Sequence, residues 1–137
     1  MDIEPHTPPR TFAADRRGGI TIRHCADVHL RPDEMVTFVT ESGARYDVVR
    51  KAWGYYAAPS LNHRLPASGF RPALVRNAAD KLFLLLVEAG REPEFQAYLD
   101  AEGHRVVCWL DGGDAVRCLH ATPDAAMPGE HEQRANP

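Results

Sequence analysis

Lysine is nearly absent from this chain of 137 residues, which contains only Lys51 and Lys81. Lysine and arginine together number 16 against 19 aspartates and glutamates, so the formal net charge is −3. A domain that binds nucleic acid by bulk charge usually carries a basic face. The composition therefore argues against nucleic-acid binding. We attribute the preference for arginine to a GC-rich bacterial genome rather than to phosphate recognition, although arginine does bind anions bidentately.

Long apolar runs are also absent from the sequence. No stretch of about twenty apolar residues is present, so the sequence predicts no membrane-spanning helix. Residues 1–17 are polar, contain Pro5, Pro8 and Pro9, and lack the apolar centre of a signal peptide. We therefore expect a soluble, cytoplasmic, bacterial protein that does not bind membranes.

Cysteine is scarce, with Cys25, Cys108 and Cys118 as the only three residues of this type. An odd and low number of cysteines is not typical of a disulfide framework. Free thiols in a reducing compartment fit this composition better.

The domain organisation follows from where proline, glycine and charge accumulate. Residues 1–19 and residues 122–137 are rich in these residue types and offer little apolar surface to bury. We therefore predict a disordered N-terminal arm over 1–19 and a disordered C-terminal tail over 122–137. Residues 20–121 between them have the length of a single domain.

Alternating apolar and polar residues predict several strands. Residues 35–40 and 45–49 alternate on either side of a short loop with Gly43, which is typical of a β-hairpin. Residues 73–76 and 82–87 form a second candidate hairpin, and the continuous apolar run in 82–87 indicates burial on both faces. Further strands are expected at residues 20–24 and 105–110.

The clearest helix signal covers residues 92–102. Pro93 suits the first helical turn and Gly103 is a natural stop after the last one. An apolar stripe at i, i+3 and i+4 predicts which face docks on the sheet. The stripe consists of Phe95, Tyr98 and Leu99. A shorter helix is expected at residues 114–119, where Asp114 can cap the first turn.

The order of these elements predicts an α+β fold. We expect a mostly antiparallel sheet of about five to six strands with one main helix and a short C-terminal helix. The helix connection leaves open whether the strand at 105–110 runs parallel to the strand at 82–87 through a right-handed crossover.

Residues 51–70 show neither the helical nor the strand period. Loops of about twenty residues without structure are uncommon and are often functional. Aromatic walls with a few polar groups are typical of small-ligand pockets, and arginines in such a pocket pair with anions. The candidate ligand-binding residues are Arg50, Lys51, Trp53, Tyr55, Tyr56, Ser60, Asn62, His63, Arg64 and Arg71.

The same segment also suits a packing role. Its aromatic side chains, with Leu61 and Leu65, can cover a sheet that is apolar on both faces, and Ser60 can cap one helical turn after Pro59. Because buried aromatic residues usually belong to the core, we favour the packing role over the ligand site.

Metal-ligating residue types occur in two places: His24, Cys25, Asp27 and His29, and Cys118 with His120. Neither place contains the Cys-x-x-Cys pair of a zinc knuckle. His24 and His29 are five residues apart, so on a strand they point to opposite faces. The sequence therefore predicts no metal site and no cofactor.

Catalytic motifs are equally absent. No Gly-x-Ser-x-Gly elbow accompanies combinations such as Ser60, His63 and Asp47, and no phosphate-binding glycine motif is present. The catalytic residues stay unknown, and the sequence leaves open whether the protein is an enzyme.

Two functional hypotheses follow from these patterns. The first is a small accessory or interaction protein that self-associates as a homodimer, because the two-sided apolar strands outnumber the helices that can cover them. The alternative is a small binding protein or enzyme for an anionic metabolite, a phosphosugar or a nucleotide, that uses the aromatic and basic residues between Lys51 and Arg71.

Overall fold

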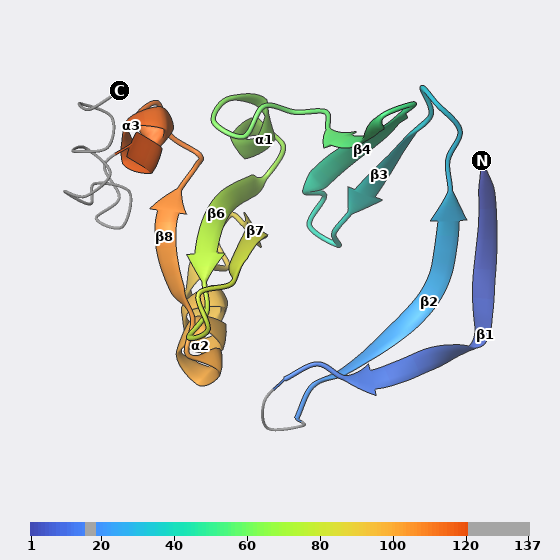
Figure 1. Cartoon of the computed structure of the whole chain (residues 1–137), viewed down its shortest axis with the longest axis horizontal. Helices are drawn as coiled ribbons and strands as arrows, with labels where there is room; N and C mark the ends of the chain where they lie inside the picture. The colour runs from blue at the N-terminus through green and yellow to red at the C-terminus, as the bar shows by residue number, and fades with distance from the viewer. Residues whose placement is uncertain (16–18, 121–137) are drawn as a thin grey trace, which may run out of the picture. The chain divides into compact units, whose positions relative to one another are not determined.

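The computed structural model describes residues 1–15 and 19–120 (Figure 1). The chain forms two compact units. The first unit contains Met1–Phe38 and Tyr46–Ala58, and the second contains Val39–Arg45 and the described residues from Pro59 onward. The single domain over residues 20–121 stays a prediction. The tail predicted over residues 122–137 lies outside the described residues.

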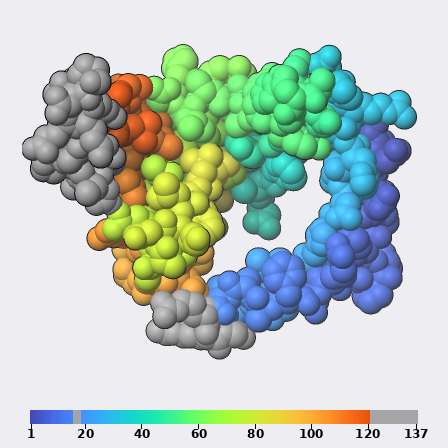
Figure 2. Space-filling model, viewed as in Figure 1, coloured from blue at the N-terminus to red at the C-terminus, as the bar shows by residue number. Residues whose placement is uncertain are grey.

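The first unit begins with a long antiparallel hairpin of β1 (Asp2–Ala13) and β2 (Thr21–His29). Figure 2 shows these two strands as a narrow blue band. The sequence predicted a disordered arm where β1 lies. Two of the three prolines that suggested disorder, Pro8 and Pro9, fall in a break of the pairing between the Pro5–Ala26 and Arg10–His24 partners. Because Pro8 and Pro9 have no amide donor, the break costs the strand no ladder hydrogen bond at these positions.

A three-stranded sheet follows in the chain, with the order β3-β4-β5. Its strands are β3 (Met35–Val39), β4 (Arg45–Lys51) and β5 (Gly54–Ala57). The hairpin predicted over residues 35–49 is confirmed by β3 and β4. None of the residues in these three strands falls in the buried class, so this sheet has little core of its own.

Among the described residues, those of the buried class all lie in the second unit, and several of them lie in its three-stranded sheet. β6 (Phe70–Arg76) is its central strand and pairs antiparallel with β7 (Leu82–Glu88) and with β8 (Arg105–Trp109). β7 and β8 therefore run in the same direction on either side of β6, which answers the question of orientation that the sequence left open. The helices of the unit are α1 (Arg64–Ala67), α2 (Glu92–Glu102) and α3 (Ala115–His120).

The core of the second unit is divided between two clusters. Leu99 of α2 packs on Ala73 and Val75 of β6, with Phe95 at the edge of this cluster. The helix predicted over residues 92–102 is thus confirmed, and it docks by part of its predicted stripe. The second cluster joins β8 to α3 and consists of Cys108, Leu110 and Ala115.

A disulfide joins Cys108 of β8 to Cys118 of α3, and Cys25 is a free, exposed cysteine. The prediction of three free thiols is wrong for this pair. The turn before α3 brings the helix back over β8, so two cysteines ten residues apart in sequence meet. The number of cysteines in a sequence does not predict a contact that the fold creates.

The predicted single sheet of five to six strands with one main helix is also wrong. Strands make up 48% of the structure and helices 18%, and the strands form three small sheets of two or three strands. Apolar alternation identifies strands and their neighbours in a hairpin, but it does not show which hairpins share a ladder. Among the described residues, no helix is long and apolar enough to cross a membrane.

Candidate metal centre

The break in the β1–β2 pairing creates the most distinctive group of side chains in the first unit. Four residues of β1 stand between the two paired stretches, where β2 has only Cys25. Such irregularities re-aim side chains that a regular ladder would keep apart. Here the break brings the ring of His6 close to the ring of His24, with 4.5 Å between their centroids.

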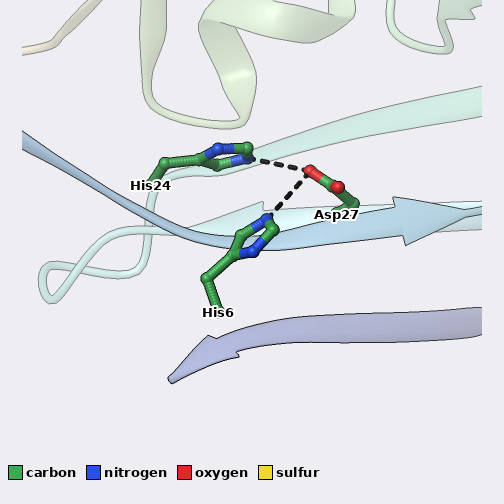
Figure 3. Close-up of side chains that lie close together, drawn as sticks. All are labelled: His6, His24 and Asp27. Atoms are coloured by element: carbon green, nitrogen blue, oxygen red, sulfur yellow. Dashed lines mark ion pairs between the residues drawn. The ribbon is translucent and has the colours of Figure 1, made fainter. Parts of the chain in front are cut away.

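Asp27 completes this group, as Figure 3 shows. Its Oδ1 atom lies 2.9 Å from Nε2 of His24 and 3.3 Å from Nε2 of His6. One carboxylate oxygen thus faces two imidazole nitrogens that come from different strands. The three side chains are partly buried, which leaves them within reach of solvent.

Arg10 is the fourth member of the group. Its Nη2 atom lies 2.8 Å from Nδ1 of His24 and 3.1 Å from Nε2 of His6, but 3.9 Å from Oδ1 of Asp27. A guanidinium has only donors, so it must approach the lone pair of an imidazole nitrogen. The contacts of Arg10 therefore require that Nδ1 of His24 and Nε2 of His6 are both unprotonated.

These requirements agree for His24 and conflict for His6. A bare Nδ1 on His24 places its proton on Nε2, which then donates to Asp27. A bare Nε2 on His6 instead turns its lone pair toward the carboxylate oxygen of Asp27, 3.3 Å away. Protonation of this Nε2 removes that repulsion but sets its N–H against the N–H groups of Arg10. No single protonation state satisfies both contacts of His6.

Asp27 is the anionic centre of the group. The close contact with His6 is the largest effect that lowers the pKa of Asp27, and the proximity of His6, His24 and Arg10 lowers it further, against a partial desolvation. Asp27 is therefore a carboxylate at neutral pH, which is the form that binds cations.

One of the two distances between imidazole and carboxylate matches the edge of a tetrahedral metal site, whereas the 2.9 Å between His24 Nε2 and Asp27 Oδ1 is a hydrogen-bond distance. Metal–ligand bonds of about 2.0–2.1 Å in a tetrahedral site place neighbouring ligand atoms about 3.3–3.4 Å apart. The separation of 3.3 Å between His6 Nε2 and Asp27 Oδ1 matches this edge, and the ligand atoms of the three residues all lie within 4.8 Å of one another. Two imidazoles and one carboxylate suit zinc and neighbouring transition metals better than magnesium or calcium, which prefer oxygen ligands.

The four residues with metal-ligating side chains that lie close together in the sequence of β2 are separated in the structure. His24 and Asp27 lie together, whereas His29 pairs with Glu4 at 3.3 Å and Cys25 contacts the backbone oxygen of Arg23. His6 was missed because it lies in the arm that was predicted to be disordered. A polar strand opposite β2 was the signal that could have placed His6 beside His24.

The ten candidate ligand-binding residues are distributed over both units. The β4–β5 hairpin of the first unit carries Arg50, Lys51, Trp53, Tyr55 and Tyr56. The second unit carries Ser60, Asn62, His63, Arg64 and Arg71.

On the β4–β5 hairpin the aromatic side chains are exposed rather than packed. Trp53 is 72% exposed and stacks on Tyr56, with 6.1 Å between the ring centroids. Arg50 lies over the ring of Tyr55, 5.4 Å from its centroid. Lys51 forms an ion pair with Asp33, which raises the pKa of Lys51. The favoured packing role therefore does not describe this part of the segment.

In the second unit the same segment does pack. Leu65 is fully buried and Phe70 is nearly so. Ser60 accepts a hydrogen bond from the backbone N–H of Arg64 at 3.0 Å, as expected of a residue that precedes a helical turn. Arg71 forms an ion pair with Asp111 at 2.7 Å, so its charge already has a partner.

No protein-family model matches this chain, and neither the curated proteins nor the solved structures contain a match to it. Three ligands on an exposed hairpin leave one position of a tetrahedral ion open, which is an arrangement that binds a water molecule or an exogenous ligand.

Proposed function

We propose that the first unit binds one divalent transition-metal ion through His6, His24 and Asp27, with zinc as the reference ion. The observation that carries this proposal is that no single protonation state of His6 suits both its contact with Asp27 and its contact with Arg10. A cation between His6 Nε2 and Asp27 Oδ1 turns two facing lone pairs into two ligands. The open coordination position makes this a binding function, to which no reaction is assigned.

Calorimetric titration of untagged protein with zinc tests this proposal. We expect a stoichiometry of one ion per chain for the wild type and loss of binding for His24→Ala. His29→Ala is the matched control, because His29 lies on the same strand but pairs with Glu4 outside the group. Unchanged binding by His24→Ala, or equal losses in both variants, would contradict the proposal.

Binding must also weaken as the pH falls. Imidazole ligates metals only in its neutral form, so protonation of His6 and His24 competes with the ion. The affinity for zinc is therefore expected to fall as the pH is lowered. A pH-independent affinity would indicate ligands other than histidine.

Self-association is a second candidate function, and β7 is the feature that favours it. β7 is an edge strand of the second unit, and its Leu82 and Leu84 are 59% and 48% exposed. An edge strand with exposed apolar side chains is a template for pairing with another strand. Antiparallel pairing of two copies about Leu85 places Leu84 of one copy opposite Leu86 of the other, and brings Lys81 near the end of the strand that carries Glu88.

Light scattering decides between a dimer and a monomer. A mass of twice the 15.2 kDa of one chain is expected for the wild type, and Leu84→Lys is expected to return the single-chain mass. Val116→Lys is the control, since Val116 is also an exposed apolar residue but lies on α3. A single-chain mass for the wild type would remove this candidate without affecting the metal site.

A further inference from the structure

Arg10 occupies an electron pair that a metal ion needs, that of His6 Nε2. Its Nη2 atom lies within hydrogen-bond distance of one nitrogen of each histidine, and these contacts are shorter than its distance to the carboxylate of Asp27. Guanidinium groups usually pair with carboxylates in a bidentate arrangement. In this group the guanidinium is directed at two imidazole nitrogens instead, in the place of a cation.

We propose that Arg10 is a built-in competitor of the metal ion and sets the affinity of the site. This inference rests on the proposed function. The lone pair of His6 Nε2 accepts either an N–H of Arg10 or a metal ion, but not both. A guanidinium that remained in place would also stand within a few ångströms of a dication, and like charges at that distance repel.

The exposure of Arg10 makes it a competitor rather than a block. Its side chain is 61% exposed, so it can swing into solvent when an ion arrives. Before binding, the guanidinium offsets the charge of Asp27. Release of Arg10 therefore accompanies metal binding. The free energy needed to break the contacts of Arg10 lowers the affinity for the ion.

The alternative is that Arg10 positions the ligands, and this role predicts a change in metal affinity of the opposite sign when Arg10 is removed. If Arg10 served only to orient His6 and His24, its removal would loosen the ligands and weaken binding. If Arg10 competes, its removal frees His6 Nε2 and strengthens binding. The sign of the change in affinity distinguishes the two roles.

The test compares Arg10→Met with Arg23→Met in zinc titrations against a chromophoric chelator. Arg23 immediately precedes His24 on β2 and is exposed, so both variants lose the same charge close to the site, but only one loses a contact with the ligands. We expect the dissociation constant for zinc to fall about tenfold or more in Arg10→Met and to change less than about threefold in Arg23→Met. Arg10→Lys retains the charge without the planar fork and is expected to lie between the wild type and Arg10→Met.

Equal changes in the two methionine variants would show that only net charge matters, and weaker binding by Arg10→Met would assign the positioning role; either result overturns the inference. Circular dichroism of the variants shows whether the hairpin is retained, and Arg10→Lys provides the same comparison if Arg10→Met does not fold. If His24→Ala abolishes zinc binding while Arg10→Met leaves it unchanged, the inference fails and the proposed function stands. If the wild type binds no zinc, both fail.

Discussion

Nε2 of His24 lies 2.9 Å from Oδ1 of Asp27, three residues further along the same strand. In a regular strand, residues i and i+3 point to opposite faces. The contact coincides with the irregular pairing of β2 with β1 around Cys25. The break in the ladder, rather than the spacing of the ligands in sequence, is therefore what assembles the group with His6.

The first prediction concerns Glu88 at the end of β7, which accepts hydrogen bonds from Ser42 and Thr40 that lower its pKa. A carboxyl group whose pKa is lowered by folding stabilises the fold above its usual titration range, and this contribution is lost as the pH falls through the lowered value. Glu88→Gln is expected to be less stable than the wild type near pH 7 and to approach it near pH 3. Urea unfolding at both pH values checks this, and a difference that did not vary with pH would contradict it.

The second prediction concerns the docking of α2. Leu99 is almost fully buried, and its truncation leaves a cavity against Ala73 and Val75. Leu99→Ala is expected to lower the free energy of unfolding by about 2–5 kcal/mol. Tyr98→Ala is the comparison, since Tyr98 is partly exposed on the same helix and should cost less. Equal losses in denaturant unfolding would show that α2 does not dock by Leu99.

The third prediction separates backbone strain from steric clash. Gly69 and Gly43 both have positive φ angles, +101° and +93°, so alanine is strained at either position. A Cβ atom at position 69 would also lie 2.8 Å from Cβ of Ala44, whereas a Cβ atom at position 43 would meet nothing within 4 Å. Gly43→Ala is expected to cost about 1–2 kcal/mol and Gly69→Ala about 1–3 kcal/mol more. Thermal unfolding of both variants measures the difference, and equal costs would contradict the close approach.

The fourth prediction concerns the disulfide between Cys108 and Cys118. In protein that is denatured without reductant, thiol titration is expected to find one reactive thiol per chain, that of Cys25, and three after reduction. Closing a loop of this length stabilises a fold by about 2–3 kcal/mol, so Cys118→Ser should lower stability by that amount under oxidising conditions only. Three thiols before reduction would contradict the disulfide.

The sequence predicted the elements whose signals are local. Pro93 and Gly103 mark the ends of α2, and alternation around Gly43 marks the β3–β4 hairpin; both features depend on neighbours in the chain. β1 was not predicted, because prolines were interpreted as disorder although Pro8 and Pro9 lie where the ladder is interrupted.

The sites depend on contacts that no local pattern contains. His6 and His24 are eighteen residues apart and meet only because the two strands pair with a break. Cys108 and Cys118 meet only because α3 returns over β8. The division of the strands into three sheets is non-local in the same way, so the single predicted sheet and the three free thiols were wrong for a common physical reason.

X-ray absorption at the zinc edge of the loaded protein tests the metal centre most directly. Ligation by His6, His24 and Asp27 predicts only nitrogen and oxygen neighbours at about 2.0–2.1 Å, with the outer-shell scattering of two imidazole rings. In His24→Ala the imidazole scattering should fall to that of one ring or the zinc should be lost. A sulfur neighbour at about 2.3 Å would place the ion on Cys25, and an absence of imidazole scattering would place it on carboxylates alone; either spectrum would contradict the proposed centre.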